Sequence, residues 1–335
     1  MRIRARAVAG ISAASLALAM ASGCAVSGKS DSGDGPVKIA YLTASAANTW
    51  LTASGKAMQE DAKKNNVEIT TFDAKFTPGA AAKQVQDVIS SGQYKGIIIA
   101  TVDGAGVIPA LQKAIKAGLK VVVLNQIIGT ELDTADPQVP GVSASVLAPP
   151  TATGERVGKL TVDACADLDP CRVVFMYGQK GTPFDTALRS TFDEQIGAHP
   201  SITVIAEGQG GFLGTDEPKK ATQDILQAHP AFDVLVGTGD QQIRGAHLAL
   251  KAAGKTDVKL IGVGGSEPAI AGLKDGTWWG DVAGAPETEG HQAFEAMMNA
   301  LDGTDDGGID VTESLVDDGL ITQANVDEFT PQWAG

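Results

Sequence analysis

The sequence predicts an α/β protein made of two doubly wound parallel-sheet units, and three observations support this. Short apolar runs alternate along the chain with stretches in which apolar residues recur at helical spacing. Two of the runs, GIIIA at 96–100 and KVVVL at 120–124, are largely β-branched, as in parallel strands that are buried on both faces. The chain of 335 residues is also too long for one typical hydrophobic core, so two units are expected.

The first unit begins with a strand, a turn and a helix in the stretch Val37 to Lys64. The apolar run at 37–42 has the length of a strand, and Asn48 is placed to cap the helix that follows it. In open α/β sheets such a turn lies at the carboxyl end of a strand, where ligands bind. The rest of this unit is expected to contain strands at 67–72, 96–100 and 120–124, with helices over 81–89 and 107–115.

The second unit follows a boundary at 134–150, where four prolines interrupt the alternation. After this stretch the alternation of strand and helix resumes. Strands are expected at 172–177, 202–206, 233–237, 259–263 and 281–283, with helices near 184–197, 216–228, 240–253 and 287–301.

The N-terminus has the pattern of an export signal. Arginines at positions 2, 4 and 6 precede an apolar segment that is too short for a normal membrane span, and small residues follow up to Cys24. This pattern resembles a bacterial lipoprotein signal. The resemblance implies removal of residues 1–23, a lipid on Cys24, and an extracytoplasmic protein anchored to the cell membrane. Residues 24–36 are rich in Ser, Gly and Asp and are expected to form a flexible tether.

Apart from Cys24, the chain has two cysteines, Cys165 and Cys171. An even number of cysteines in an exported protein suggests a disulfide, and a helix-to-strand corner could bring this pair within reach. The sequence alone leaves the pairing open. A metal site is a weaker alternative because no histidine lies nearby, and a nucleophilic cysteine would need a base that the sequence does not supply.

Composition and motifs argue against several functions. The net charge of −14 disfavours a nucleic-acid partner, because binding to phosphates needs a basic surface. None of the four histidines has a serine or cysteine at the spacing of a known catalytic arrangement. The glycines at 262–265 lack the third glycine of a dinucleotide-binding loop, and the acidic run at 302–310 lacks EF-hand spacing. An enzyme is therefore not expected, and no catalytic residue, cofactor or metal is predicted.

Several stretches together carry a family resemblance. They are the opening strand with Asn48-Thr49-Trp50, the units from Phe72 to Gln126, the segment GTPFDTALRSTF from Gly181, and the segment from Gly239 to Gly265. In order and spacing, residues 37–330 resemble type I periplasmic sugar-binding proteins, the ribose-binding branch of ABC-transporter receptors.

The resemblance implies two lobes joined by a hinge of three crossovers, near 138–142, 284–287 and 308–314. The expected lobes are residues 37–139 plus 286–310 and residues 140–285 plus 311–335. A monomer would capture a sugar, polyol or modified sugar between the lobes and deliver it to an ABC transporter permease. Two alternatives remain open, namely a receptor that reports to a membrane sensor kinase and a binder of a non-sugar metabolite.

The resemblance also assigns the ligand contacts. Trp50 and Phe212 are expected to stack on the ligand, because the C–H face of a sugar packs well on an aromatic ring. Asp240 could instead cap the helix that follows it. The full set is Asn48, Trp50, Asp103, Asn125 and Gln126 from the first lobe, and Phe184, Phe212, Asp240, Gln241, Gly264 and Ser266 from the second.

The chain departs from the family at the polar clamp. Ribose-type receptors have an Asp-Arg pair after the fourth strand, where this chain has Asn125-Gln126. Their other clamp residues fall near Leu188, Gly239, Gly264 and Gly284. Amides and glycines would thus replace a charged clamp, so tight binding of ribose is not expected. The glycines are expected to leave room for a bulkier, less hydroxylated or charged ligand.

Overall fold

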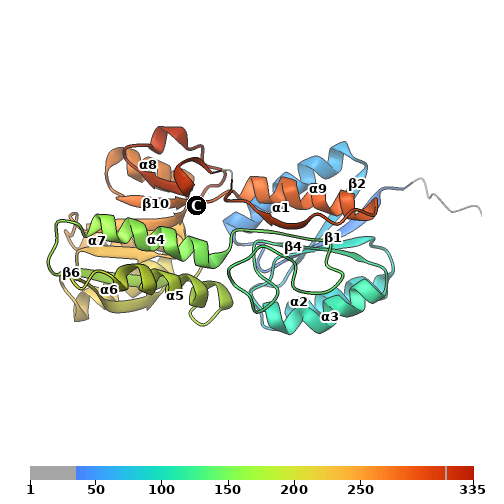
Figure 1. Cartoon of the computed structure of the whole chain (residues 1–335), viewed down its shortest axis with the longest axis horizontal. Helices are drawn as coiled ribbons and strands as arrows, with labels where there is room; N and C mark the ends of the chain where they lie inside the picture. The colour runs from blue at the N-terminus through green and yellow to red at the C-terminus, as the bar shows by residue number, and fades with distance from the viewer. Residues whose placement is uncertain (1–34, 314) are drawn as a thin grey trace, which may run out of the picture. The chain divides into compact units, whose positions relative to one another are not determined.

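The computed structural model describes residues 35–313 and 315–335. The expected signal segment 1–23 and Cys24 lie outside the described residues. Within them the chain forms two α/β lobes, each built on a six-stranded sheet with helices on both faces (Figure 1). None of the described helices combines the length and apolar character that crossing a membrane would require.

The first-lobe sheet has the strand order β11-β5-β4-β3-β1-β2, and all its pairs are parallel. Helices α1 and α9 pack side by side on one face, and α2 and α3 cover the other (Figure 1). The strands are β1 (Val37–Thr43), β2 (Val67–Asp73), β3 (Gly96–Ile99), β4 (Lys120–Leu124), β5 (Ala144–Leu147) and β11 (Gly307–Asp310). The helices are α1 (Thr49–Lys64), α2 (Ala80–Ser91), α3 (Gly104–Lys116) and α9 (Pro286–Leu301).

The second-lobe sheet has the order β12-β10-β9-β8-β6-β7 and is parallel except for β12, which runs antiparallel to β10. Helices α4 and α5 cover one face, and α6, α7 and α8 the other. The strands are β6 (Cys171–Tyr177), β7 (Ile202–Gln209), β8 (Val234–Gly237), β9 (Lys259–Gly264), β10 (Gly280–Ala283) and β12 (Leu320–Thr322). The helices are α4 (Pro150–Ala164), α5 (Pro183–Gly197), α6 (Asp216–Ala228), α7 (Asp240–Ala252) and α8 (Glu267–Asp275), with short 3-10 turns η1 (Val316–Gly319) and η2 (Val326–Glu328).

The predicted strands and helices are present, and most of their ends agree within one or two residues. Continuous apolar runs do become strands buried on both faces, such as β3 and β4. Strands β5, β11 and β12 and helix α8 were not predicted. The three strands contain only three or four residues each, and β11 and β12 are partly exposed, so they lack a clear apolar pattern.

The first crossover between the lobes lies later than expected. Strand β5 pairs with β4 and β11 in the first-lobe sheet, so the chain leaves this lobe after Leu147 and not near 138–142. The predicted lobe boundary between residues 139 and 140 is therefore wrong. Strand β5 is short and has prolines on both sides, so its apolar residues were not recognised as a strand of the first lobe. The other crossovers, at 284–285 and directly after Asp310, fall close to their predicted positions.

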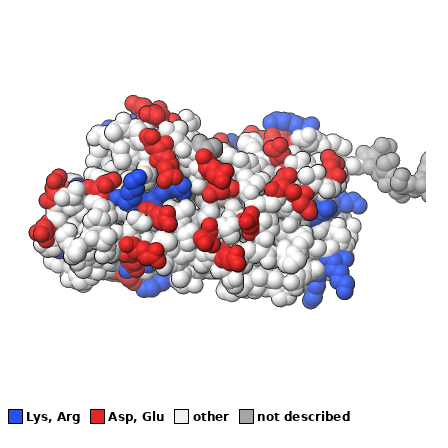
Figure 2. Space-filling model, viewed as in Figure 1, with Lys and Arg blue, Asp and Glu red and all other residues white. Residues whose placement is uncertain are grey.

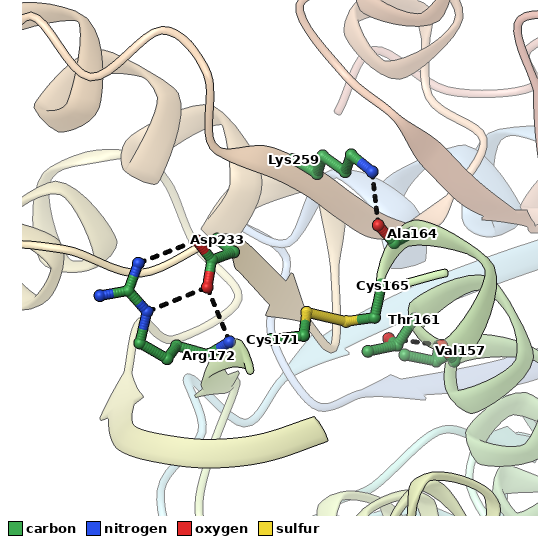
Figure 3. Close-up of a disulfide and its surroundings, with 8 residues drawn as sticks. All are labelled: Val157, Thr161, Ala164, Cys165, Cys171, Arg172, Asp233 and Lys259. Carbon is green, nitrogen blue, oxygen red and sulfur yellow. Dashed lines mark hydrogen bonds and ion pairs between the residues drawn. A yellow bond between two sulfur atoms is a disulfide. The ribbon is translucent and has the colours of Figure 1, made fainter. Parts of the chain in front are cut away.

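A disulfide between Cys165 and Cys171 joins α4 to β6, and this confirms the predicted pairing. Cys165 ends α4 and Cys171 begins β6, with their Cα atoms 5.7 Å apart and both residues buried (Figure 3). A closed loop this short stabilises the fold by about 2 kcal/mol in the chain-entropy account. Beside it, Arg172 binds the carboxylate of Asp233 through its side chain at 3.0 Å and through its backbone N–H at 2.8 Å. The guanidinium group of Arg172 lowers the pKa of Asp233.

Acidic side chains lie in separate groups over both lobes on the face drawn in Figure 2, with basic side chains between them. On that face the basic groups do not merge into a continuous band. This pattern agrees with the net charge of −14.

Candidate functional site

A cavity of about 120 Å³ lies where the carboxyl ends of the strands in the two sheets face each other. Both lobes and all three crossovers contribute to its wall, and most of the wall is apolar, which is typical of small-molecule sites. The aromatic rings in the wall are Trp50, Phe76, Phe184, Phe212 and Trp333, the amides are Asn48, Asn125, Gln126 and Gln241, and the charged residues are Arg156 and Glu289.

The structure brings together most of the residues predicted to contact the ligand. Those that line the cavity are Asn48, Trp50, Asn125, Gln126, Phe184, Phe212 and Gln241. They come from the first turn of α1, the end of β4, the loop between β7 and α6, and the first turns of α5 and α7. The residues that the family resemblance assigned here therefore lie beyond the carboxyl ends of parallel strands, where open α/β sheets bind ligands.

The other predicted contacts do not reach the cavity. Asp103 caps α3, where its Oδ1 accepts from the N–H of Gly106 at 3.0 Å, and it lines a different hollow. Asp240 and Ser266 are fully buried in the second lobe. The carbonyl oxygen of Gly264 accepts a hydrogen bond from the Trp333 indole, which lies between this glycine and the cavity. None of these four residues is therefore part of the cavity wall.

Asp240 is not a helix cap either, because it is the first residue of α7 and Gly239 occupies the cap position. Its Oδ2 accepts from the N–H of Ser266 at 2.8 Å, and Asp281 Oδ1 accepts from the N–H of Gly265 at 3.0 Å. The two carboxyl groups thus hold the turn that follows β9 against β10, directly behind the cavity wall.

Asn48 caps α1 as predicted and also links the two lobes. Its Oδ1 accepts from the N–H of Leu51 at 2.9 Å, which places Trp50 in the first turn of the helix. Its Nδ2 donates to the carbonyl oxygen of Phe212, in the second lobe, at 2.9 Å. One side chain therefore both starts the helix and closes one side of the cavity.

Glu289 connects the polar residues of the first lobe. Its Oε2 accepts from Trp50 Nε1 at 2.7 Å, and Asn125 Nδ2 approaches both carboxylate oxygens at 3.3 and 3.4 Å. Asn125 in turn accepts from Gln126 Nε2 at 3.1 Å. Asn125 has a φ of 65°, a left-handed conformation that asparagine tolerates better than most residues, and this turns its side chain toward Glu289.

The charge of Glu289 is fully buried. Burial raises the pKa of this carboxyl group to about 7, and the N–H donors of Trp50 and Asn125 oppose that rise. Within residues 35–313 and 315–335, no cation lies within ion-pair distance of it. Glu289 was not predicted, because a glutamate in the first turn of a helix after Pro286 has the ordinary role of stabilising the helix N-terminus.

Arg156 lies on α4 in the second lobe and was also missed. Its Nη2 donates to Asp318 Oδ1 at 2.8 Å and to Thr312 Oγ1 at 3.3 Å, and only 11% of its side chain is exposed. In the segment ERVGK it has the sequence context of an ordinary surface residue of a helix. The cavity therefore does contain two charged groups, Arg156 and Glu289, at positions other than those of the charged clamp in ribose-type receptors.

The glycines near the cavity do not provide room for a ligand, contrary to expectation. A methyl group at Gly284 would come within 2.2 Å of the Trp50 ring, and one at Gly264 within 2.5 Å of the Trp333 ring. The rings of Trp50 and Trp333 also meet edge to face, with their centres 5.4 Å apart. The protein's own indole rings therefore fill the space over these glycines. Trp333 was missed because it follows the last element that the sequence predicts.

Comparison with known proteins identifies the family. A family model described as a periplasmic binding protein domain matches residues 39–305. The xylitol-binding protein of Mycolicibacterium smegmatis is 24% identical over 84% of this chain and 76% of its own length. The ribose import binding protein of Escherichia coli is 25% identical over 79% of this chain and 85% of its own length.

Solved structures agree with this result. An ABC transporter solute-binding protein from Mycobacterium smegmatis with bound glycerol is 26% identical, with a TM-score of 0.77 over 90% of this chain and all of that one. A solute-binding protein from Bacillus halodurans with bound myo-inositol has the same fold, with a TM-score of 0.77 over 88% of this chain and 98% of that one, at 22% identity. The chain therefore belongs to the periplasmic binding protein family and has its type I fold.

Proposed function

We propose that this protein is an extracytoplasmic receptor that captures a sugar, polyol or modified sugar in the cavity between its lobes and delivers it to an ABC transporter permease. The observation that carries the proposal is the wall of that cavity, where aromatic rings and amides from both lobes converge. Aromatic rings pack on the C–H faces of such ligands, and amides bind their hydroxyl groups. The named ligands of the relatives, xylitol and ribose, belong to this class.

The receptor acts by binding alone in this proposal. The contacts would be the predicted residues that line the cavity, with Trp50 and Phe212 as stacking faces. Trp50 is well suited to this role, because its indole N–H is already held by Glu289 and its ring is therefore fixed before the ligand arrives.

A ligand screen tests the proposal. The chain without residues 1–24 is expected to be stabilised in thermal unfolding by at least one sugar or polyol, because a ligand at about 100 times its Kd adds roughly 2.7 kcal/mol. The panel should contain xylitol, myo-inositol, arabinose, glucose, ribose, nucleosides and small organic acids. Ribose should give a small shift, since Asn125-Gln126 replaces the charged pair of ribose-type receptors. A response to nucleosides or acids alone would contradict the proposal and favour a non-sugar metabolite.

We further propose that the mature protein is a monomer anchored by a lipid on Cys24. The support is the sequence pattern before this cysteine. Cys24→Ala should leave the membrane fraction, whereas the double variant Cys165→Ser, Cys171→Ser should stay in it. Membrane fractionation with an antibody to the protein measures this, and membrane retention of Cys24→Ala would contradict the anchor.

A further inference from the structure

The two charged side chains of the cavity come from different lobes. Arg156 lies on α4, which begins at Pro150 directly after the first crossover, and Glu289 lies on α9, which begins at Pro286 directly after the second. A ligand that contacts both side chains would therefore connect the lobes next to the hinge.

Arg156 has hydrogen-bond donors to spare. Its Nη2 binds Asp318 and Thr312, whereas Nε and Nη1 are buried and have no partner in the part of the chain that the structure describes. A guanidinium group has five N–H donors, and buried donors without acceptors are costly. Because Arg156 lines the cavity wall, a ligand oxygen atom in the cavity would satisfy them once the guanidinium group turns toward it. Because Asp318 already balances the charge of Arg156, this acceptor need not be an anion.

Glu289 has the opposite property, with acceptor capacity to spare. A carboxylate offers about four lone-pair positions. Trp50 supplies one short hydrogen bond, and Asn125 supplies two long contacts from a single nitrogen. Hydroxyl donors of a ligand would complete the set and would also favour the ionised carboxylate.

Among the described residues that face Glu289, none contributes a second buried carboxyl group. From α1 it faces Trp50, and from β1 it faces Tyr41, whose hydroxyl donates to the carbonyl of Leu51 at 3.1 Å and stays neutral because burial raises its pKa. Asn125 faces it from the end of β4, and Arg156 lines the same cavity from α4. On α9 itself, Glu287 is exposed and His291 pairs with Asp61 of α1 at 2.5 Å.

We propose that Arg156 and Glu289 form a clamp that bridges the lobes and selects a neutral polyhydroxylated ligand, with Arg156 donating to ligand oxygens and ionised Glu289 accepting from ligand hydroxyls. The inference rests on the proposed function. A hydroxyl group both donates and accepts, so one such molecule can serve both residues. A sugar acid would place a second negative charge in the cavity with Glu289, where little water screens it.

The clamp makes binding depend on pH. Ligand hydroxyls bind the ionised form of Glu289, whose pKa of about 7 in the free protein would fall on binding. Affinity should therefore increase as the pH rises through neutrality, by at most about tenfold per pH unit, and binding should release protons.

Isothermal titration calorimetry with two matched pairs of probes, xylitol with xylonate and glucose with gluconate, tests the clamp. The better neutral probe should lose at least tenfold in affinity in Arg156→Gln and in Glu289→Gln. Two exposed residues on the same helices provide controls, and Lys159→Gln and Glu287→Gln should stay within twofold of the wild type. The rise in affinity from pH 6 to pH 8 should disappear in Glu289→Gln only.

The outcomes separate the clamp from the proposed function. Neutral probes that bind equally well to wild type and to both charge variants would overturn the clamp and leave the function intact, as would tighter binding of the acids. If the variants fail to fold, the pH dependence of binding by the wild type still tests the clamp. Affinity of the wild type for the neutral probe that does not change with pH would overturn the clamp. If neither neutral probe nor any sugar or polyol of the screen binds, the proposed function fails and the clamp with it.

Discussion

Replacing Asp281 with asparagine is expected to stabilise the protein at neutral and alkaline pH. Asp281 and Asp240 are both fully buried, and each has one oxygen, Oδ2 and Oδ1 respectively, with no hydrogen-bond donor in the described structure. Those two oxygens face the same point, because a methyl group at Gly262 would lie 2.5 Å from one and 2.7 Å from the other. Two carboxyl oxygens can be neighbours in this way when they share a proton.

The shared proton determines the sign of the effect. Burial raises the pKa of both carboxyl groups, and the charge of Asp240 raises that of Asp281 further. The folded state therefore holds a proton that the unfolded state releases near pH 4. The contribution of this pair to stability is therefore greatest below that pH and decreases as the pH rises toward the folded-state pKa. An asparagine at position 281 can donate permanently where the proton now lies, and it keeps its oxygen for the N–H of Gly265.

Chemical unfolding between pH 4 and pH 9 measures the difference. Asp281→Asn should match the wild type near pH 4 and exceed it by roughly 1–3 kcal/mol at pH 8, the usual cost of an unsatisfied buried polar group. Asp281→Ala should be less stable at every pH, because it leaves the N–H of Gly265 without an acceptor. Asp257→Asn, which removes an exposed charge from the same lobe, is the control. A wild type and Asp281→Asn with parallel pH profiles would rule out the shared proton.

The sequence predicts the parts of the site that depend on local structure. Asn48 follows a strand and precedes an apolar helical pattern, so its roles as cap and as cavity residue both follow from the chain around it. Asn125 and Gln241 were assigned by the family resemblance, and each follows the carboxyl end of a predicted strand. Only the inference for Asn48 needed no knowledge beyond the local sequence.

The missed residues depend on contacts between distant segments. Glu289 and Arg156 each resemble ordinary helix residues, and only the crossovers bring both of them to one cavity. Strand β5 was missed for a related reason, since its neighbour β11 lies far along the chain. The prediction that Gly264 and Gly284 leave room for a ligand failed for the same reason. The sequence shows that a glycine has no side chain, but it does not show which distant residue fills the space above it.

Gly284 lies in the second crossover and lines the cavity, and its replacement with alanine should disrupt the cavity. The added methyl group would lie 2.2 Å from Cη2 and 2.4 Å from Cζ3 of Trp50, well inside contact distance. The indole cannot move freely, because Nε1 is bound to Glu289 and the ring of Trp333 packs against it. The variant must therefore break the bond to Glu289 or shift the crossover, and overpacking of this kind costs about 1–3 kcal/mol.

A double-mutant cycle with Trp50→Phe tests this explanation, since phenylalanine has no ring atoms where the overlap occurs. Gly284→Ala should lower the unfolding free energy of the wild type by clearly more than that of Trp50→Phe, with a coupling of roughly 1 kcal/mol or more. Gly197→Ala is the matched control, because no atom lies within 4 Å of the added methyl group and alanine favours the helix. Near-ultraviolet circular dichroism should report an altered Trp50–Trp333 pair in Gly284→Ala and an unchanged pair in Gly197→Ala. Equal losses of unfolding free energy in the wild-type and Trp50→Phe backgrounds would contradict this explanation. The backbone at position 284, and not the indole ring, would then be what requires a glycine.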